Sequence, residues 1–272
     1  VHVVTKKVEA SYPYKDGYEL NLEGEKAEIR VEAWDKAEVG VEIDMISRHP
    51  DKAVAEKALE YINHKIERVG NKIYIRNFLS GDSNPDQNAQ LHVKYFIRVP
   101  AQCPVYVKNI YGLATFRNLE KSLRIFSQFT RLGIENMKGE LNVTTRFGDL
   151  EGQHLDGQIQ IESRRSDILL SHLSGNVDLN TYYGKITLSE LEELLSLNIQ
   201  AEKSDIFLQN IESQKFGYLI NASNASLNLP ASLPFDFAEG SDGMRKASYK
   251  PAKEFYPGIT ITLRLGSLNI NR

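Results

Sequence analysis

Between residues 105 and 229 one corner motif recurs six times, as Tyr111-Gly112-Leu113, Phe129-Thr130-Arg131, Phe147-Gly148-Asp149, Arg165-Ser166-Asp167, Tyr183-Gly184-Lys185 and Lys203-Ser204-Asp205. The middle residue advances by 18 positions at each step except the last, where it advances by 20. A fixed period of this kind is typical of repeat proteins, in which each repeat is one structural unit that stacks on the next.

Apolar residues show the same period independently of the corners. Each repeat opens with two apolar residues two positions apart, from Val105/Val107 to Leu197/Ile199, and a second pair follows the corner, from Ala114/Phe116 to Ile206/Leu208. A single apolar residue then follows, at Leu119, Met137, Leu155, Leu173, Leu191 and Ile211. Spacing of two predicts strands that turn one face inward.

These features together predict one coil of a β-solenoid per repeat. Two short strands are separated by the corner motif and by a second bend at Gly139, Gly157 and Gly175. One coil buries too few apolar side chains to offset the entropy of ordering its backbone, so coils must stack about 4.8 Å apart. We therefore expect an all-β fold, a right-handed β-solenoid (single-stranded β-helix) with about 18 residues per coil and one N-terminal helix.

The handedness rests on a separate comparison. Left-handed hexapeptide solenoids also use about 18 residues per coil, but they place one aliphatic residue every six positions. Here the inward slots fall at offsets 0, 2, 9, 11 and 14 of the repeat. This pattern excludes the hexapeptide class and leaves a right-handed solenoid or a flattened, two-faced relative.

Residues 1–100 are predicted to form an N-terminal β-rich region that holds the first rungs and a cap. Strands are expected within residues 1–46, 72–78 and 91–99, with a looser first rung at 29–41 and a polar loop at 80–88. A helix is expected at 50–69, where Val54, Ala58, Tyr61, Ile62, Ile66 and Val69 form an apolar stripe that ends before Gly70.

Residues 101–272 are predicted to form the regular solenoid repeats. Beyond residue 211 the apolar pairs return around Ala225 and again around Gly266. The final rung is therefore expected at 259–272. An insertion at 230–258, rich in Pro, Gly and aromatic residues, separates it from the preceding repeats and either caps the solenoid or projects from it.

Composition narrows the class of protein. The formal net charge of -3 provides no basic footprint for nucleic acid, and no apolar run reaches the length of a membrane-spanning helix. Cys103 is the single cysteine, so no internal disulfide is expected. The chain begins at Val1 rather than Met, which we interpret as the loss of a processed export signal or of other N-terminal residues.

Candidate sites are sought as columns, because stacking places equivalent residues of successive repeats above one another. The corner column contains the rings of Tyr111, Phe129, Phe147 and Tyr183, with Arg165 and Lys203 between or beyond them. We interpret these rings as closing the corner of the core. If they are exposed instead, the four aromatic residues are candidate ligand-binding residues that form a stacking platform for sugars or for an arginine-rich partner.

Two other columns carry chemistry-bearing residues. Asp149 and Asp167, with Arg165 or Lys185 as base, are the best candidates for a polysaccharide lyase or hydrolase site. His154 and His172, with Glu190, could hold a divalent metal, although solvent-facing turn residues are the commoner outcome. The sequence contains no Gly-x-Ser-x-Gly elbow, phosphate loop or dinucleotide fingerprint, so we predict no catalytic residue, metal or cofactor.

Four motifs, two before the repeats and two within them, carry a family resemblance. They are Trp34-Asp35-Lys36 before Val39, the strand Tyr95 to Pro100, the run Val105-x-Val-x-Asn-x-Tyr-Gly, and Gly-Asp-Leu/Ile corners. The chain resembles the bacterial putative adhesins, domain-of-unknown-function families related to the head domain of putative auto-transporter adhesins. It departs from them at the non-glycine corners Thr130, Ser166 and Ser204 and in its twenty-residue fifth coil.

The resemblance implies a right-handed solenoid that is exported to the periplasm or cell surface of a Bacteroidetes-like bacterium. Its function is expected to be that of a non-enzymatic binding scaffold. The expected partner is a surface glycan or an envelope protein, not nucleic acid, and homodimers could form through the end rungs. A carbohydrate-active enzyme on the same scaffold is the alternative.

Overall fold

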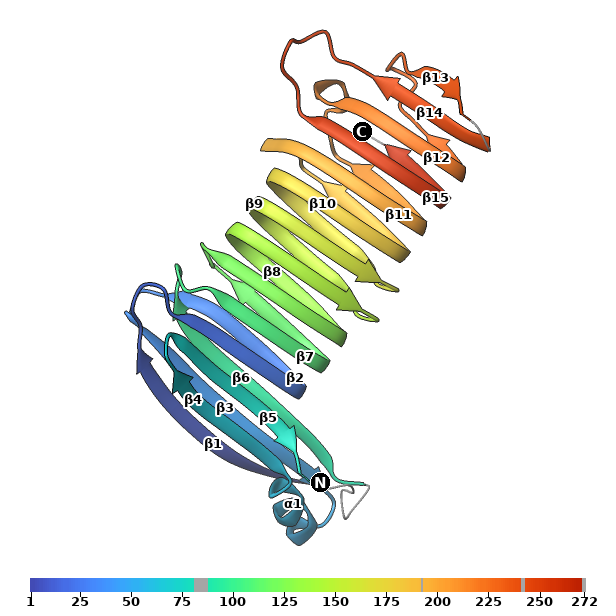
Figure 1. Ribbon diagram of the computed structural model, residues 1–272. Coiled ribbons are helices and arrows are strands. Elements are labelled where there is room, and N and C mark those ends of the chain that lie inside the picture. The colour runs from blue at the N-terminus through green and yellow to red at the C-terminus, as the bar shows by residue number, and fades with distance from the viewer. Residues whose placement is uncertain (81–87, 192, 241–242, 271–272) are drawn as a thin grey trace. The chain divides into compact units, whose positions relative to one another are not determined.

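The computed structural model describes residues 1–80, 88–191, 193–240 and 243–270. In this part of the chain nearly all regular structure is β, accompanied by α1 (Lys52–Leu59) and a 3-10 turn at Ser213–Lys215 (Figure 1). The chain divides into two compact units, Val1–Gly133 and Ile134–Arg272. Most of the predicted loop at 80–88 lies outside the described residues, and the predicted division at residue 100 stays a prediction.

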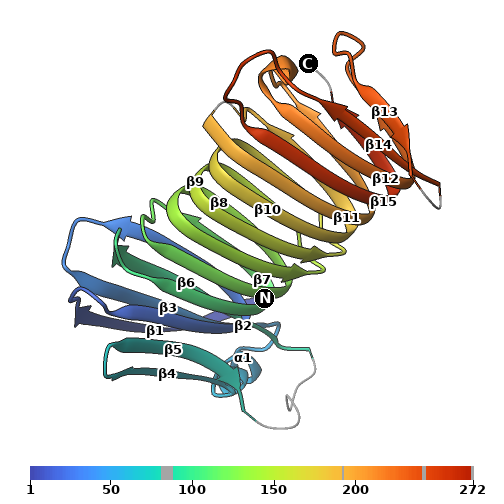
Figure 2. The same ribbon diagram turned by 45° about the horizontal axis from the view of Figure 1, so that its top comes forward.

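The first unit is built around a central strand, β2. Its strands are β1 (His2–Pro13), β2 (Glu19–Trp34), β3 (Glu38–His49), β4 (Ile62–Val69), β5 (Lys72–Leu79), β6 (Gln90–Pro100), β7 (Val105–Arg117) and the first part of β8 (Ser122–Arg146). The first half of β2 pairs with β5 and its second half with β6, and β7 follows its other edge, all in parallel. The β4–β5 hairpin and α1 therefore form a layer separate from β1, β3 and β6 (Figure 2).

The first repeat lies in β2 rather than at residues 29–41, so that prediction is wrong. Leu20 pairs with Val105 and Ile29 pairs with Ala114, which makes β2 the structural equivalent of the repeats that follow. After Trp34 the chain turns back into β3, which runs antiparallel to β6. The Trp34 indole donates a 2.8 Å hydrogen bond to the Glu38 carbonyl and so ties the two ends of this turn together.

The predicted helix at 50–69 is correct only in its first half. Asp51 caps α1 by accepting hydrogen bonds from two backbone N–H groups, and α1 packs on β1 and β3. Residues 62–69 instead form β4, which pairs with β5 through a two-residue turn with Gly70 at φ +61°. Isoleucine and valine in this segment favour a strand, and the neighbouring β5 supplies hydrogen-bond partners that the helix would not have used.

The second unit continues the repeats from the latter part of β8 through β9 (Leu150–Arg164), β10 (Ile168–Ser189) and β11 (Glu193–Gln209). These strands follow one another side by side (Figure 1) and pair in parallel. Val177 lies opposite Ile159, which is 18 residues earlier. Every apolar residue predicted to point inward within the six repeats is buried, with no side chain more than 5% exposed. The inward face predicted from the period-two spacing is therefore confirmed.

The end of the repeat region departs from chain order. The last strand, β15 (Gly258–Ile270), lies between β11 and β12 (Gly217–Asn228), because Ile259 pairs with both Leu197 and Tyr218. The insertion at 230–258 contributes β13 (Asp236–Glu239) and β14 (Met244–Tyr249), and β14 pairs antiparallel with β12. The insertion thus covers the outer edge of β12.

The fifth repeat accommodates part of its extra length as a β-bulge. Gly175 pairs with Leu194 but Asn176 pairs with Ser196, so Leu195 is left out of the ladder and is 65% exposed. A bulge of this kind keeps the inward slots in register on both sides.

Candidate functional site

The corner column is built by a repeated backbone conformation. All six residues lie in the left-handed region, with φ values of 64° at Tyr111, 50° at Phe129, 57° at Phe147, 53° at Arg165, 58° at Tyr183 and 52° at Lys203. This conformation is uncommon for residues other than glycine. In the second unit, hydrogen bonds hold it in place: the Phe147 N–H donates to the Arg164 carbonyl, and the Arg165 N–H donates to the Tyr182 carbonyl.

The next corner position explains how the non-glycine departures are tolerated. Thr130, Ser166 and Ser204 are buried, and each hydroxyl donates to the carbonyl two residues earlier, at 2.9, 3.2 and 2.9 Å respectively. A hydroxyl that satisfies a backbone carbonyl beside a bend can therefore occupy this position in place of glycine.

The aromatic residues of the corner column are exposed. Tyr111 is 51%, Phe129 45%, Phe147 43% and Tyr183 36% exposed. The interpretation that these rings close the corner of the core is therefore wrong. The left-handed backbone directs them away from the inward slots, which aliphatic residues fill.

In the first unit the exposed rings form one stacked pair. The centroids of Tyr111 and Phe129 are 4.9 Å apart, and the ring planes differ by 6°. The pair offers a flat aromatic surface at the corner of this unit.

In the second unit the column alternates rings with cations, and we call Phe147, Arg165, Tyr183 and Lys203 the corner ladder. The Arg165 guanidinium carbon lies 5.8 Å from the Phe147 centroid and 5.6 Å from that of Tyr183. The Lys203 ammonium lies 4.9 Å from the Tyr183 centroid. These distances are those of cation–π contacts.

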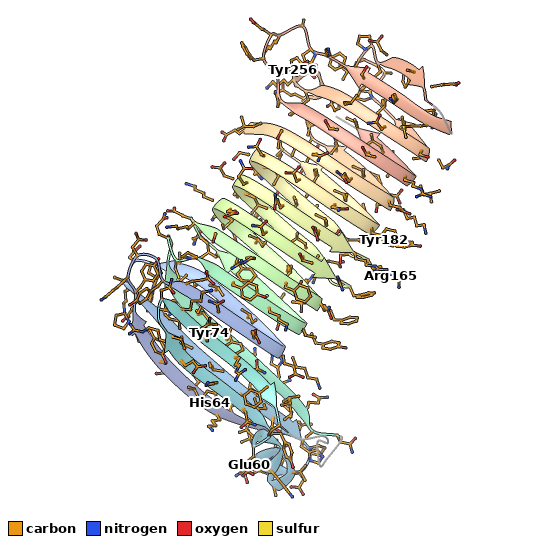
Figure 3. The ribbon with its side chains drawn as sticks, viewed as in Figure 1. Glu60, His64, Tyr74, Arg165, Tyr182 and Tyr256 are labelled. Atoms are coloured by element: carbon orange, nitrogen blue, oxygen red, sulfur yellow. The ribbon has the colours of Figure 1, made fainter. Side chains whose placement is uncertain are left out.

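A second row of side chains runs beside the corner ladder. Arg164 lies over the ring of Tyr182 at 5.4 Å, and the Tyr182 ring meets that of Tyr183 edge-on at 4.6 Å. Tyr182 and Arg165 project outward at the same edge of the strands (Figure 3). The sequence-based search missed Arg164 and Tyr182, although Arg164-Arg165 and Tyr182-Tyr183 stand 18 residues apart and signal a widened column.

Titration of Tyr183 is coupled to Lys203. The Lys203 ammonium donates a 2.9 Å hydrogen bond to the phenol oxygen of Tyr183. This bond, assisted by the nearby positive charges of Lys203 and Arg165, holds the pKa of Tyr183 below its ordinary value, and it raises the pKa of Lys203. Both shifts follow because the bond favours the charged form of each group.

We expect Lys203→Gln to raise the pKa of Tyr183 toward that of an ordinary phenol, because the hydrogen bond and the charge that favour the phenolate are both removed. The measurement is the phenolate absorbance as a function of pH, taken as the difference between each protein and its Tyr183→Phe counterpart. Lys185→Gln is the matched control, since Lys185 contacts Phe207 instead. An unchanged titration of Tyr183 in Lys203→Gln would contradict this coupling.

The carboxylates proposed for a lyase site are engaged with the backbone. Asp149 Oδ1 accepts the Asp167 N–H at 2.9 Å, and Asp167 Oδ1 accepts the Lys185 N–H at 2.9 Å. Arg165, the base considered beside them, contacts the rings of the corner ladder. Each aspartate side chain therefore links its own repeat to the backbone of the next one.

The column of His154, His172 and Glu190 lies at a different bend of the repeat from the corner column, and there the three side chains lie close together. The imidazole centroids of His154 and His172 are 4.2 Å apart, and His172 Nδ1 lies 2.9 Å from Glu190 Oε2. Across residues 1–80, 88–191, 193–240 and 243–270, no group of three or more His, Cys, Asp or Glu side chains has a geometry that could hold a metal ion. The three residues therefore form a tilted ring pair, with one close contact between an imidazole nitrogen and a carboxylate oxygen.

Cys103 lies buried at the start of the repeats. Burial raises the pKa of its thiol to about 12, which keeps it protonated at neutral pH. The structure thus gives it the role of a core residue.

Comparison with known proteins gives matches at the level of structure. A putative adhesin from Bacteroides fragilis is similar over 98% of this chain and 97% of its own, with 13% identity and a TM-score of 0.54. The chain shares its fold with this putative adhesin. No family model and no curated protein matches the sequence.

Two further solved structures are similar over nearly their whole length. One is a putative cell adhesion protein from Clostridium sporogenes, with 15% identity, 98% and 99% coverage of the two chains and a TM-score of 0.30. The other is a putative lipid binding protein from Parabacteroides distasonis, with 11% identity, 97% and 96% coverage and a TM-score of 0.40. The predicted resemblance to putative adhesins agrees with the name of the Bacteroides fragilis structure.

Within the described residues, no helix is both long and apolar enough to cross a membrane.

Proposed function

We propose that this protein is a non-enzymatic binding scaffold of the bacterial cell envelope, exported to the periplasm or cell surface. In this proposal it is a right-handed β-solenoid that binds a surface glycan through the aromatic residues of its corners. The parallel pairing of residues 18 apart in β9 and β10 supports stacked coils. The similarity to a putative adhesin supports the role of scaffold.

One observation carries the proposal, namely that the corner rings are exposed. Folding normally buries tyrosine and phenylalanine rings, which supply large apolar area. Here the left-handed backbone holds Tyr111 and Phe129 stacked in the first unit, and Phe147 and Tyr183 within the corner ladder of the second. Rigidly held, exposed rings lose little conformational entropy when they bind a ligand, which suits them to stack on the apolar faces of sugars.

We expect the double substitution Phe147→Ser and Tyr183→Ser to weaken glycan binding about tenfold or more, because two stacking contacts of about 0.5 to 1.5 kcal/mol each are lost. A glycan array identifies the ligand, and titration calorimetry then compares the variants. Leu195→Ser is the control, because it removes an apolar side chain that is more exposed than either ring, at 65%, from the bulge of the same unit.

Two outcomes would contradict the proposal. The first is a blank result for the wild-type protein on glycan arrays. The second is a double variant that binds as tightly as the wild type while Leu195→Ser weakens binding.

A further inference from the structure

We propose that the corner ladder recognises an acidic polysaccharide of the uronate type, with Arg165 as the residue that binds its carboxylate groups. This inference rests on the proposed function and specifies its ligand. Four features of the molecule support it: the contacts of Arg165, the charge around it, the hydrogen bonds of the nearby carboxylates, and the spacing of the ladder.

Arg165 is held by rings, which leave its N–H donors available. Phe147 and Tyr183 lie on neighbouring repeats, at 5.8 and 5.6 Å from its guanidinium carbon. The described residues give Arg165 no carboxylate within ion-pair distance. The rings restrict the Arg165 side chain, but they do not accept hydrogen bonds from the N–H groups in the plane of the guanidinium. These N–H groups are therefore preorganised to bind a carboxylate from outside the chain.

Positive charge is concentrated around Arg165. In the corner column and the column before it, four successive repeats of the second unit together carry four cations and one acidic residue. The cations are Arg146, Arg164, Arg165 and Lys203, and the acidic residue is Glu202. The whole chain has a net charge of -3, so this local excess is opposite in sign to the protein. Such a patch attracts an anionic ligand locally rather than through the charge of the whole molecule.

The carboxylates nearest this patch are committed elsewhere. Asp149 and Asp167 stand two residues beyond the corner positions, and each accepts a backbone N–H of the next repeat. Each carboxylate keeps its charge, but it is oriented toward the backbone of the next repeat. A carboxylate of the ligand can therefore pair with the guanidinium of Arg165.

The spacing of the ladder suits a linear sugar polymer. Successive members of the ladder stand one strand spacing apart, about 4.8 Å, so a chain lying along the column meets a ring, a cation and a ring in turn. Rings suit the apolar faces of sugars, and the guanidinium suits a planar carboxylate.

The test compares polygalacturonate with its fully methyl-esterified form, which has the same sugar chain without the charge. We expect wild-type protein to bind the acid polymer about tenfold or more tightly than the ester, by titration calorimetry, and Arg165→Gln to abolish this preference. The matched control is Arg68→Gln, which removes an equal charge from an exposed cation–π pair with Tyr18 in the first unit and is expected to keep the preference.

Three results would overturn the inference. In the first, the two polymers bind equally tightly and loss of the Tyr183 ring weakens both. The ligand would then be a neutral glycan, and the proposed function would stand. Equally tight binding of a single-stranded oligonucleotide would show a general anion surface. Binding of neither polymer would exclude uronates, and the glycan array would then decide the proposed function separately.

Discussion

Gly175→Ala is expected to lower the free energy of unfolding by about 4 kcal/mol. Gly175 has φ +82°, and a Cβ built there would lie 2.3 Å from the carbonyl oxygen of Gly157, its partner on the preceding repeat. That oxygen belongs to a paired backbone and cannot move without disturbing the ladder. Alanine therefore adds a steric clash to the ordinary strain of a left-handed residue. Urea denaturation followed by far-UV circular dichroism measures the loss.

Gly17→Ala separates these two causes. Gly17 has nearly the same φ, +87°, but no atom lies within 4 Å of the position of its Cβ. We expect this variant to lose only about 1 kcal/mol, the conformational cost alone. Equal losses in the two variants would mean that the close approach of neighbouring repeats at Gly175 contributes nothing to the stability.

Leu170→Ala is expected to lower the free energy of unfolding by about 3 kcal/mol, whereas Leu169→Ala should cost less than about 0.5 kcal/mol. Leu170 is fully buried opposite Gly152 of the preceding repeat, and Leu169 is 50% exposed. A Cβ on Gly152 would lie 2.7 Å from a Leu170 methyl group, so the leucine fills the space that the glycine leaves. Its removal therefore creates a cavity.

The two leucines are matched in chemistry and adjacent in sequence, so they differ in facing direction alone. The same urea denaturation experiment compares them. Similar losses for both would contradict the alternation of inward and outward faces on which the interpretation of the repeats depends.

The repeat period was sufficient to predict the core. Residues such as Val177 and Leu179 recur in pairs two apart, and a strand with that pattern can bury all of them only by turning one face inward. The second half of the predicted helix was wrong because its apolar pattern does not distinguish a helix from a strand. Ile62, Ile66 and Val69 suit a helical stripe and a strand equally, and the choice was made by pairing with β5, which comes later in the chain.

The candidate site was predictable in part. The column of Tyr111, Phe129, Phe147 and Tyr183 followed from the 18-residue spacing, but an aromatic residue at a corner can point into the core or out of it. Arg164 and Tyr182 were missed because the search followed one column and did not test its neighbour. Their contacts with the ladder depend on side-chain directions that the spacing does not specify.

By itself the sequence determined the all-β class, the inward slots and which residues of successive repeats would lie together, because these depend on local periodicity and on burial of apolar area. Only the tertiary structure decided that the last strand lies between β11 and β12 and that the corner rings are exposed. The first depends on pairing between segments distant in the chain. The second depends on a left-handed backbone that is stable only when hydrogen bonds from the adjoining repeats hold it in place.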